Sequence, residues 1–296
     1  NGLGDGPFHG VPFATKDLAV MVKGAPLTSG SRAFKDVVSD QDGVITARYK
    51  AAGLSIFATT TTPEFGLTIT TESVLFGQTR NPWDVTRTTG GSSGGASAAV
   101  AAGVIPVAQA SDGGGSIRIP ASCTGLFGMK PSRGRTPMGP ATTEGWNGQS
   151  ITHAVSRSVR DNAALLDATH GREIGSRYVA PGPDGSFLSA LTAPNGTRPD
   201  ADAQAGLDAT RTLLENLGHI VEEAGPVLDG AALGKGLLMT ISAAMAMIME
   251  DRGAALGREM GADDMEPVTL RMRDFGRTVP MAELMRANQA AITAAM

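Results

Sequence analysis

Short apolar runs alternate with helical patterns along the first 130 residues. The runs VPFAT (11–15) and LSIFATT (54–60) have the length and composition of buried strands, and VIPVAQAS (104–111) predicts a third strand. Helical patterns over 43–53 and 97–103 precede the second and third strands. This alternation predicts an α/β fold in which helices pack on a sheet.

The second half of the chain is mostly helical in pattern. Apolar positions at helical spacing predict helices over 157–171 and 202–217, each ending at a glycine. A strand is expected at 219–224, and 230–296 is expected to be mostly helical and rich in methionine. The connecting loops are rich in proline and glycine: 134–148 and 180–200.

Composition excludes several classes of protein. The formal net charge is −4 without a basic stripe, which argues against a nucleic-acid partner. The only cysteine, Cys123, excludes an internal disulfide and favours a cytoplasmic location. No pair of histidines has zinc-ligand spacing, so we expect neither a metal nor another cofactor. The longest uncharged run, Gly236–Met249, is shorter than a membrane span and predicts a buried helix.

Three segments carry candidate chemistry, and the glycine-rich one around Ser116 is the first. The consecutive glycines Gly113, Gly114 and Gly115 allow backbone N–H groups to turn to one side, and a helix is expected to follow. Such a loop suits the oxyanion of a tetrahedral intermediate, with the Ser116 hydroxyl as the attacking group. The alternative is a tight strand–helix turn in which the serine caps the helix.

The second segment, Thr89–Gly95, has the same two interpretations. Its glycines and serines either cap a helix or hold a strained backbone near a site. It also contains G-x-S-x-G around Ser93, the pattern of a nucleophile elbow. A Ser–His–Asp esterase would then use Ser93 with partners from later in the chain: Asp161 or Asp167, and His170 or His219. An elbow serine should follow a strand directly, whereas 81–89 is expected to be a loop.

The third segment is a strand that ends in Lys16. A lysine at a strand end is usually an ordinary surface residue. If it is buried instead, loss of solvation lowers its pKa and provides a neutral amine that can act as a base. Ser–Lys pairs are an alternative to Ser–His–Asp, and no histidine is near either glycine–serine loop in sequence.

Together these segments resemble the amidase signature family. The resemblance covers about residues 7–170, in this order: GPFHGVPFATKD, TRNPWD, TTGGSSGGASAAVAAG, SDGGGSIRIPAS, GMKPSRGR and SRSVRD. It implies an α/β fold with a large mixed twisted sheet flanked by helices on both faces. The family's usual first helices and last strands are not found in this chain, so the fold is expected to be incomplete at both termini.

The resemblance implies amide hydrolysis through a Ser–cis-Ser–Lys triad and an acyl-enzyme. Ser116 is then the nucleophile, Ser92 the bridging serine after a cis peptide bond, and Lys16 the base. The backbone N–H groups of Gly113, Gly114, Gly115 and Ser116 form the oxyanion hole. The supporting residues are Ser93, Asp112 and Arg118, of which Arg118 could instead pair only locally.

We expect one amidase domain over residues 1–296. Residues 1–135 form the catalytic core, and 136–296 form a helical part that contributes to the substrate pocket, including Trp146. The expected partner is a small-molecule amide; a homodimer is compatible with the resemblance, and no membrane or nucleic acid is expected. The residues of these motifs resemble those of stand-alone bacterial amidases, including those that hydrolyse nylon-oligomer amides. The remaining alternatives are the esterase using Ser93 and a catalytically silent binding protein.

Overall fold

The structure, a computed structural model, describes residues 5–183, 185–190, 212, 215 and 229–293. Two expected elements lie largely outside this part: the helix over 202–217, of which only Thr212 and Glu215 are described and are helical, and the strand over 219–224. The other elements predicted from the hydrophobic pattern can be compared with the structure directly.

The chain opens with a strand–helix–strand unit. Strands β1 (Pro12–Lys16) and β2 (Ser55–Thr60) are parallel, and helix α1 (Val44–Ala51) connects them. These elements confirm the three predicted there. β2 is not the buried strand that was predicted, because the side chain of Phe57 is 60% exposed. β1 is buried over its last four residues and carries Lys16 at its end.

A second sheet lies beside this unit. Strand β7 (Val107–Asp112) pairs antiparallel with β9 (Ile151–Ser156), which also pairs with β8 (Phe127–Gly128). The apolar run had predicted β7, but β9 was missed because buried polar residues interrupt its hydrophobic pattern. The Thr152 hydroxyl accepts a hydrogen bond from Gln109, and His153 is hydrogen-bonded to Asn162. Polar residues are tolerated inside a sheet when their hydrogen bonds are made internally.

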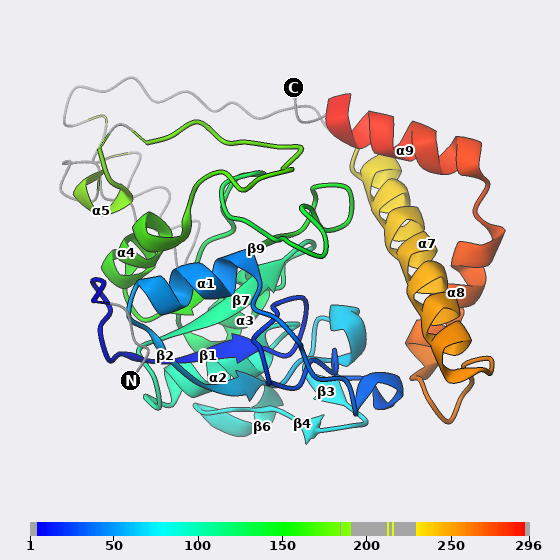
Figure 1. Cartoon of the computed structure of the whole chain (residues 1–296), viewed down its shortest axis with the longest axis horizontal. Coiled ribbons are helices and arrows are strands. Elements are labelled where there is room, and N and C mark those ends of the chain that lie inside the picture. The colour runs from blue at the N-terminus through cyan, green and yellow to red at the C-terminus, as the bar shows by residue number, and fades with distance from the viewer. Residues whose placement is uncertain (1–4, 184, 191–211, 213–214, 216–228, 294–296) are drawn as a thin grey trace.

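β1 runs next to β7 (Figure 1), although the two do not form a backbone ladder. The backbone N–H of Lys16 instead donates to the side-chain oxygen of Gln109 over 2.6 Å. The described strands therefore form small parallel and antiparallel sheets rather than the single large mixed sheet that was expected. The side-by-side placement still brings the ends of β1 and β7, and the residues that follow them, close together.

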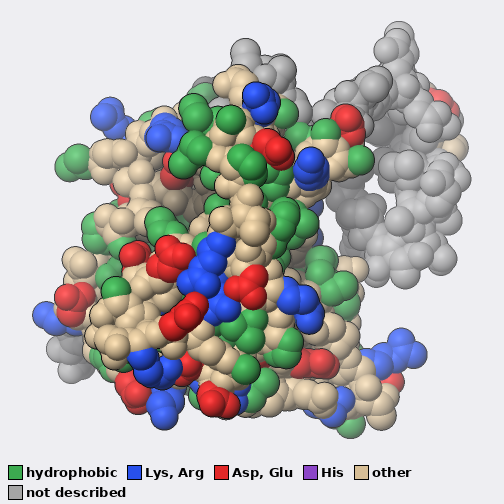
Figure 2. Space-filling model, turned by 90° about the vertical axis from the view of Figure 1, so that its right-hand side faces the viewer, with side chains coloured by type: hydrophobic (Ala, Val, Ile, Leu, Met, Phe, Trp, Pro, Cys, Tyr) green, Lys and Arg blue, Asp and Glu red, His purple; other side chains and the backbone are tan. Residues whose placement is uncertain are grey.

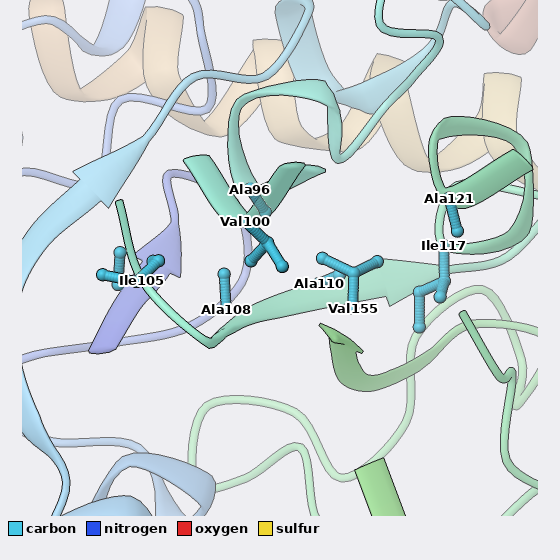
Figure 3. Close-up of a cluster of buried hydrophobic side chains, with 9 residues drawn as sticks. Ala96, Val100, Ile105, Ala108, Ala110, Ile117, Ala121 and Val155 are labelled. Atoms are coloured by element: carbon cyan, nitrogen blue, oxygen red, sulfur yellow. The ribbon is translucent and has the colours of Figure 1, made fainter. Parts of the chain in front are cut away.

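Helices cover both faces of these strands. On one face lie α2 (Gly94–Ala101) and α3 (Arg118–Thr124), whose small apolar side chains meet those of β7 and β9 (Figure 3). The cluster on this face consists of Ala14, Ala96, Val100, Ile105, Ala108, Ala110, Ile117, Ala121 and Val155. Alanine dominates it, so the two helices approach the strands closely and position the loops at their N-termini.

On the other face lie α1 and α4 (Val159–Thr169). Here the buried side chains are larger and include Phe13, Tyr49 and Leu165. α4 confirms the helix predicted over 157–171, and the Ser158 hydroxyl caps it by accepting a hydrogen bond from the Asp161 N–H. The two-sided arrangement agrees with the expected α/β fold.

The segment between β2 and α2 contains short elements that the sequence did not predict. Two hairpins are present, β3 (Glu72–Ser73) with β4 (Gly77–Gln78) and β5 (Arg80–Asn81) with β6 (Asp84–Thr88). The interpretation of 81–89 as a loop was therefore wrong. The polar β6 has mainly exposed side chains, so hydrophobic alternation could not reveal it. Short 3₁₀ helices lie at Arg32–Phe34 and Glu64–Gly66.

The C-terminal part confirms the helical prediction. After the short α5 (Phe187–Ala190), α7 (Gly230–Leu256) packs against α8 (Pro267–Thr278) and α9 (Met281–Thr293) at one end of the molecule (Figure 1). Helix α7 extends beyond the predicted apolar run Gly236–Met249 at both ends.

With 27 residues, α7 is long and apolar enough to cross a membrane by these two criteria alone. Its buried face contributes Ile241, Met245 and Met249 to a methionine-rich core, which also includes Phe65 and Met260. On the side of the molecule where α7–α9 lie, positive and negative side chains alternate with apolar ones (Figure 2). Helix α7 is therefore packed along one face, and 44% of its most apolar window is buried.

Candidate functional site

The three candidate segments meet at one cavity. Lys16 ends β1, Ser92 precedes α2, and Ser116 lies between β7 and α3. Ser92 and Ser116 both line a cavity of about 280 Å³, and so does Ser111, while Lys16 lies behind them with no exposed surface. Residues separated by up to 100 positions in sequence thus form one cluster.

Lys16 is buried among hydroxyl groups. Its Nζ atom donates to Ser92 Oγ over 2.7 Å and to Ser111 Oγ over 3.2 Å. Burial lowers the pKa of Lys16 to about 7, because the charged form loses its hydration, and the negative charge of Asp112 only partly opposes this shift. A substantial fraction of the amine is therefore neutral near neutral pH.

Ser92 is held in place by its backbone and by Gly66. The peptide bond between Gly91 and Ser92 is cis, as the family resemblance implied. A Cβ atom on Gly66 would lie 2.9 Å from Ser92 Oγ, and the φ angle of +69° at Gly66 is unfavourable for other residues. The absence of a side chain at position 66 therefore leaves the space that the Ser92 hydroxyl occupies.

Ser116 stands on a loop that Asp112 organises. The Asp112 carboxylate accepts hydrogen bonds from the N–H groups of Gly115 and Ile117, at 2.7 and 3.1 Å, and from two nitrogens of Arg118, each at 2.9 Å. Burial by itself would raise the pKa of Asp112, but these hydrogen bonds hold it below its usual value. The pair of Asp112 and Arg118 is local in sequence and lies within this loop, so the two alternatives considered for Arg118 coincide here.

The four predicted oxyanion donors are not equivalent. The N–H of Gly115 is already donated to Asp112, which corrects its assignment to the oxyanion hole. A loop needs an internal hydrogen bond to hold its shape, and Gly115 supplies it. Within the part of the chain that the structure describes, the N–H groups of Gly113, Gly114 and Ser116 have no hydrogen-bond partner.

Ser93 is fully buried, and its hydroxyl bonds to the backbone of β7. Its hydroxyl donates to the carbonyl of Ser111 and accepts from the N–H of Ser111, each over 3.3 Å. Among the described residues, no histidine bonds to Ser93 or lines the cavity, and His219 lies outside them. The described partners proposed for an esterase are engaged elsewhere: Asp161 pairs with Arg160, Asp167 accepts from the N–H groups of Phe187 and Leu188, and His170 packs edge-to-face against Phe187.

The cavity walls are mainly apolar, and Trp146 is one of them. A Cβ atom on Gly113 would lie 2.5 Å from the Trp146 ring, so the tryptophan packs directly on the loop that carries Ser116. Trp146 adopts a φ of +49°, which is unusual for a residue with a side chain. From the methionine-rich helix α7, Met245 and Ile248 also line the cavity.

Two residues at this site were not identified from the sequence. Ser111 contacts Lys16 Nζ and lines the cavity, and Gln109 anchors the Lys16 backbone. The sequence could have indicated them, because residues two apart in a strand point to the same face, and Gln109 and Ser111 are two apart in β7. Asp17, the residue after Lys16, is buried and accepts hydrogen bonds from Thr28.

No group of three metal-ligating side chains occurs among the described residues.

The site lies in an α/β fold, where a buried lysine contacts one of two serines that open onto an apolar cavity. This chain belongs to the Amidase family, whose model matches residues 2–292.

Relatives with curated descriptions agree with this assignment. The 6-aminohexanoate-cyclic-dimer hydrolase of Pseudomonas sp. (strain NK87) is 38% identical over 283 residues, which cover 89% of this chain. The chain spans 57% of the length of that relative.

Solved structures show the same fold. A 6-aminohexanoate cyclic dimer hydrolase complexed with substrate superimposes with a TM-score of 0.88 and 34% identity, covering 99% of this chain and 64% of that one. A bacterial aryl acylamidase of the amidase signature family superimposes with a TM-score of 0.83 and 27% identity, covering 97% of this chain and 63% of that one. The chain therefore has the amidase signature fold, as its motifs predicted.

Proposed function

We propose that this protein hydrolyses amide bonds, with Ser116 as nucleophile, Ser92 as proton relay and Lys16 as base. The observation that carries the proposal is the contact of 2.7 Å between the buried Lys16 Nζ and Ser92 Oγ, at a cavity onto which Ser116 also opens. Membership in the Amidase family and the names of the relatives support the same reaction.

The proton path follows from the pKa of Lys16. When the amine is neutral, its lone pair can accept the Ser92 proton, and Ser92 can then take the proton of Ser116. The Ser116 oxygen attacks the amide carbonyl and forms an acyl-enzyme. Ser92 returns the proton to the leaving amine, and water then releases the carboxylate by the same relay.

The oxyanion of each tetrahedral intermediate needs donors that are not already used. Gly113, Gly114 and Ser116 have such N–H groups on the loop that Asp112 holds, which makes them the proposed oxyanion hole. Donors fixed before the reaction stabilise the developing charge without the cost of reorienting them. Gly115 contributes indirectly, because its bond to Asp112 maintains the loop.

The walls of the cavity favour an apolar acyl or amine group next to the cleaved bond. Leu27, Phe65, Trp146, Met245 and Ile248 surround it, and the flexible methionine can adapt to different shapes. Two relatives have names that fit this chemistry, a 6-aminohexanoate-cyclic-dimer hydrolase and an aryl acylamidase. We therefore propose neutral aliphatic or aryl amides as first substrates to test.

The test is hydrolysis of a chromogenic anilide together with covalent labelling. We expect wild-type protein to release the aniline, and an aryl sulfonyl fluoride to block this and to label Ser116, as mapped by peptide mass spectrometry. Ser116→Ala should lose both activity and label, while Ser93→Ala serves as the matched control and keeps both. A label on Ser93 alone would support the esterase, and neither label nor turnover would support a binding protein.

A further inference from the structure

A second pocket adjoins the Ser116 loop at Gly113. It has a volume of about 560 Å³ and is lined by Gly113, Lys130, Ser132, Arg133, Gly148 and Gln149. Two of its six residues are cations and none is acidic. The pocket therefore differs in chemistry from the apolar cavity beside it.

Neither cation has a carboxylate partner. Within the described residues, Lys130 and Arg133 form no ion pair and no side-chain hydrogen bond. Asp112 is the acidic group that acts on Lys130, but Arg118 already occupies both of its oxygens. A half-buried cation without a counter-charge is costly, so an anionic ligand at this position would be stabilising.

The pocket also holds its arginine in a defined position. The Arg133 guanidinium lies over the ring of Tyr178, 4.9 Å from its centroid. A Cβ atom on Gly148 would lie 3.0 Å from Arg133 Cδ and 2.6 Å from the Tyr178 ring, so only glycine leaves the arginine in this place. Burial lowers the pKa of Lys130, and the neighbouring Arg118 and Arg133 add to this effect against the opposing charge of Asp112.

The two pockets share a wall. Gly113 lines both of them. In the turn over 145–150, Gly145, Trp146 and Ser150 line the apolar cavity, whereas Gly148 and Gln149 line the cationic pocket. The two pockets are therefore adjacent at Gly113 and at this turn.

We propose that Lys130 and Arg133 bind a carboxylate carried by the amide substrate, so that the preferred substrates are amides with an acidic group beyond the cleaved bond. This inference rests on the amide hydrolysis proposed above. Arg133 can bind a carboxylate through two parallel hydrogen bonds, and Lys130 adds a point charge. Ser132 and Gln149 provide further polar contacts at the pocket wall.

The experiment compares each acid with a neutral methyl derivative of the same amide, and rates are taken from the release of aniline or phenylacetate that both members of a pair share. One pair is the monoanilide of adipic acid and its methyl ester, with the carboxylate on the acyl side. The other pair is N-phenylacetylglycine and its methylamide, with the carboxylate on the amine side. We expect kcat/KM for the acid in at least one pair to exceed that of its neutral partner by roughly tenfold or more.

Three variants assign the preference to the pocket. Lys130→Met and Arg133→Gln should abolish it while turnover of the neutral substrates is kept, and Lys130→Arg should retain most of it. Arg160→Gln, at an exposed position on α4, is the matched control. Melting temperatures and rates on neutral substrates show that each variant is folded.

The outcomes separate the two proposals. No preference for either acid, or a preference that survives both charge-removing substitutions, overturns the carboxylate site. If wild-type protein hydrolyses neither neutral substrate nor acid, the proposed amidase function fails instead.

Discussion

The Nζ atom of Lys16 donates a hydrogen bond to Ser92 Oγ over 2.7 Å, and neither residue has more than 1% of its surface exposed. This contact joins the end of a strand to the start of a helix 76 residues later. Burial removes the hydration of the ammonium and lowers the pKa of Lys16. Both the activity and the stability of the protein should therefore depend on pH.

Activity should depend on the neutral form of Lys16. We expect kcat/KM to rise with pH, to be half-maximal near the lowered pKa of about 7, and to level off above it. Lys16→Arg should lose roughly 10²–10⁴-fold in rate, because a guanidinium stays protonated and cannot act as the base. Initial rates with a neutral anilide from pH 5 to about 10 measure both effects. Lys50→Arg is the control, and a flat profile would contradict the assignment of Lys16 as base.

The stability of the protein should change with pH for the same reason. Between about 7, the pKa in the folded protein, and 10.5, the ordinary value, the unfolded chain binds a proton that folded Lys16 does not. Stability therefore rises with pH in this window, by about 1.4 kcal/mol per pH unit at most. Lys16→Met should lack this rise, while Lys50→Met should keep it. Urea unfolding at pH 6, 8 and roughly 10 measures the difference, and parallel curves for wild type and Lys16→Met would contradict it.

Ser93→Ala should separate stability from catalysis. The substitution removes the hydroxyl that bonds to both backbone groups of Ser111, at 3.3 Å each. We expect a loss of about 1–3 kcal/mol in the free energy of unfolding, because it leaves a buried N–H and carbonyl without this partner. Measurable amide turnover should remain. Complete loss of activity in a folded Ser93→Ala protein would move Ser93 from a supporting to a direct role.

Gly113 and Trp146 should be coupled. Gly113→Ala introduces a Cβ only 2.5 Å from the tryptophan ring, while the backbone at this position is not in the left-handed region. We expect the variant to lose activity through displacement of Trp146 or of the Ser116 loop. A second substitution, Trp146→Ala, removes the clash and should restore part of the activity lost.

A double-mutant cycle of kcat/KM measures that coupling. Gly114→Ala is the matched control, because a Cβ there has no heavy atom within 4 Å. If Gly113→Ala lowers kcat/KM by the same factor in the wild-type and Trp146→Ala proteins, the loop itself requires glycine and the packing of the ring does not.

Much of the framework was predictable from local sequence. β1, α1, β7, α4 and the C-terminal helices follow from hydrophobic period and from capping residues, which act over a few neighbouring positions. β9 and the hairpins were not predictable in this way. Their strands are either buried with polar side chains or exposed on one edge, so neither carries an alternating apolar pattern.

The sequence by itself determined the order of the motifs, and through them the family and the candidates Lys16, Ser92 and Ser116. Only the tertiary structure decided which of the groups at the site are free to accept a proton or to donate a hydrogen bond. Burial lowers the pKa of Lys16, Asp112 takes the N–H of Gly115, and Ser111 joins the site from the strand beside it. The reason is physical: hydration, hydrogen-bond partners and steric space depend on atoms far apart along the chain, which no local pattern records.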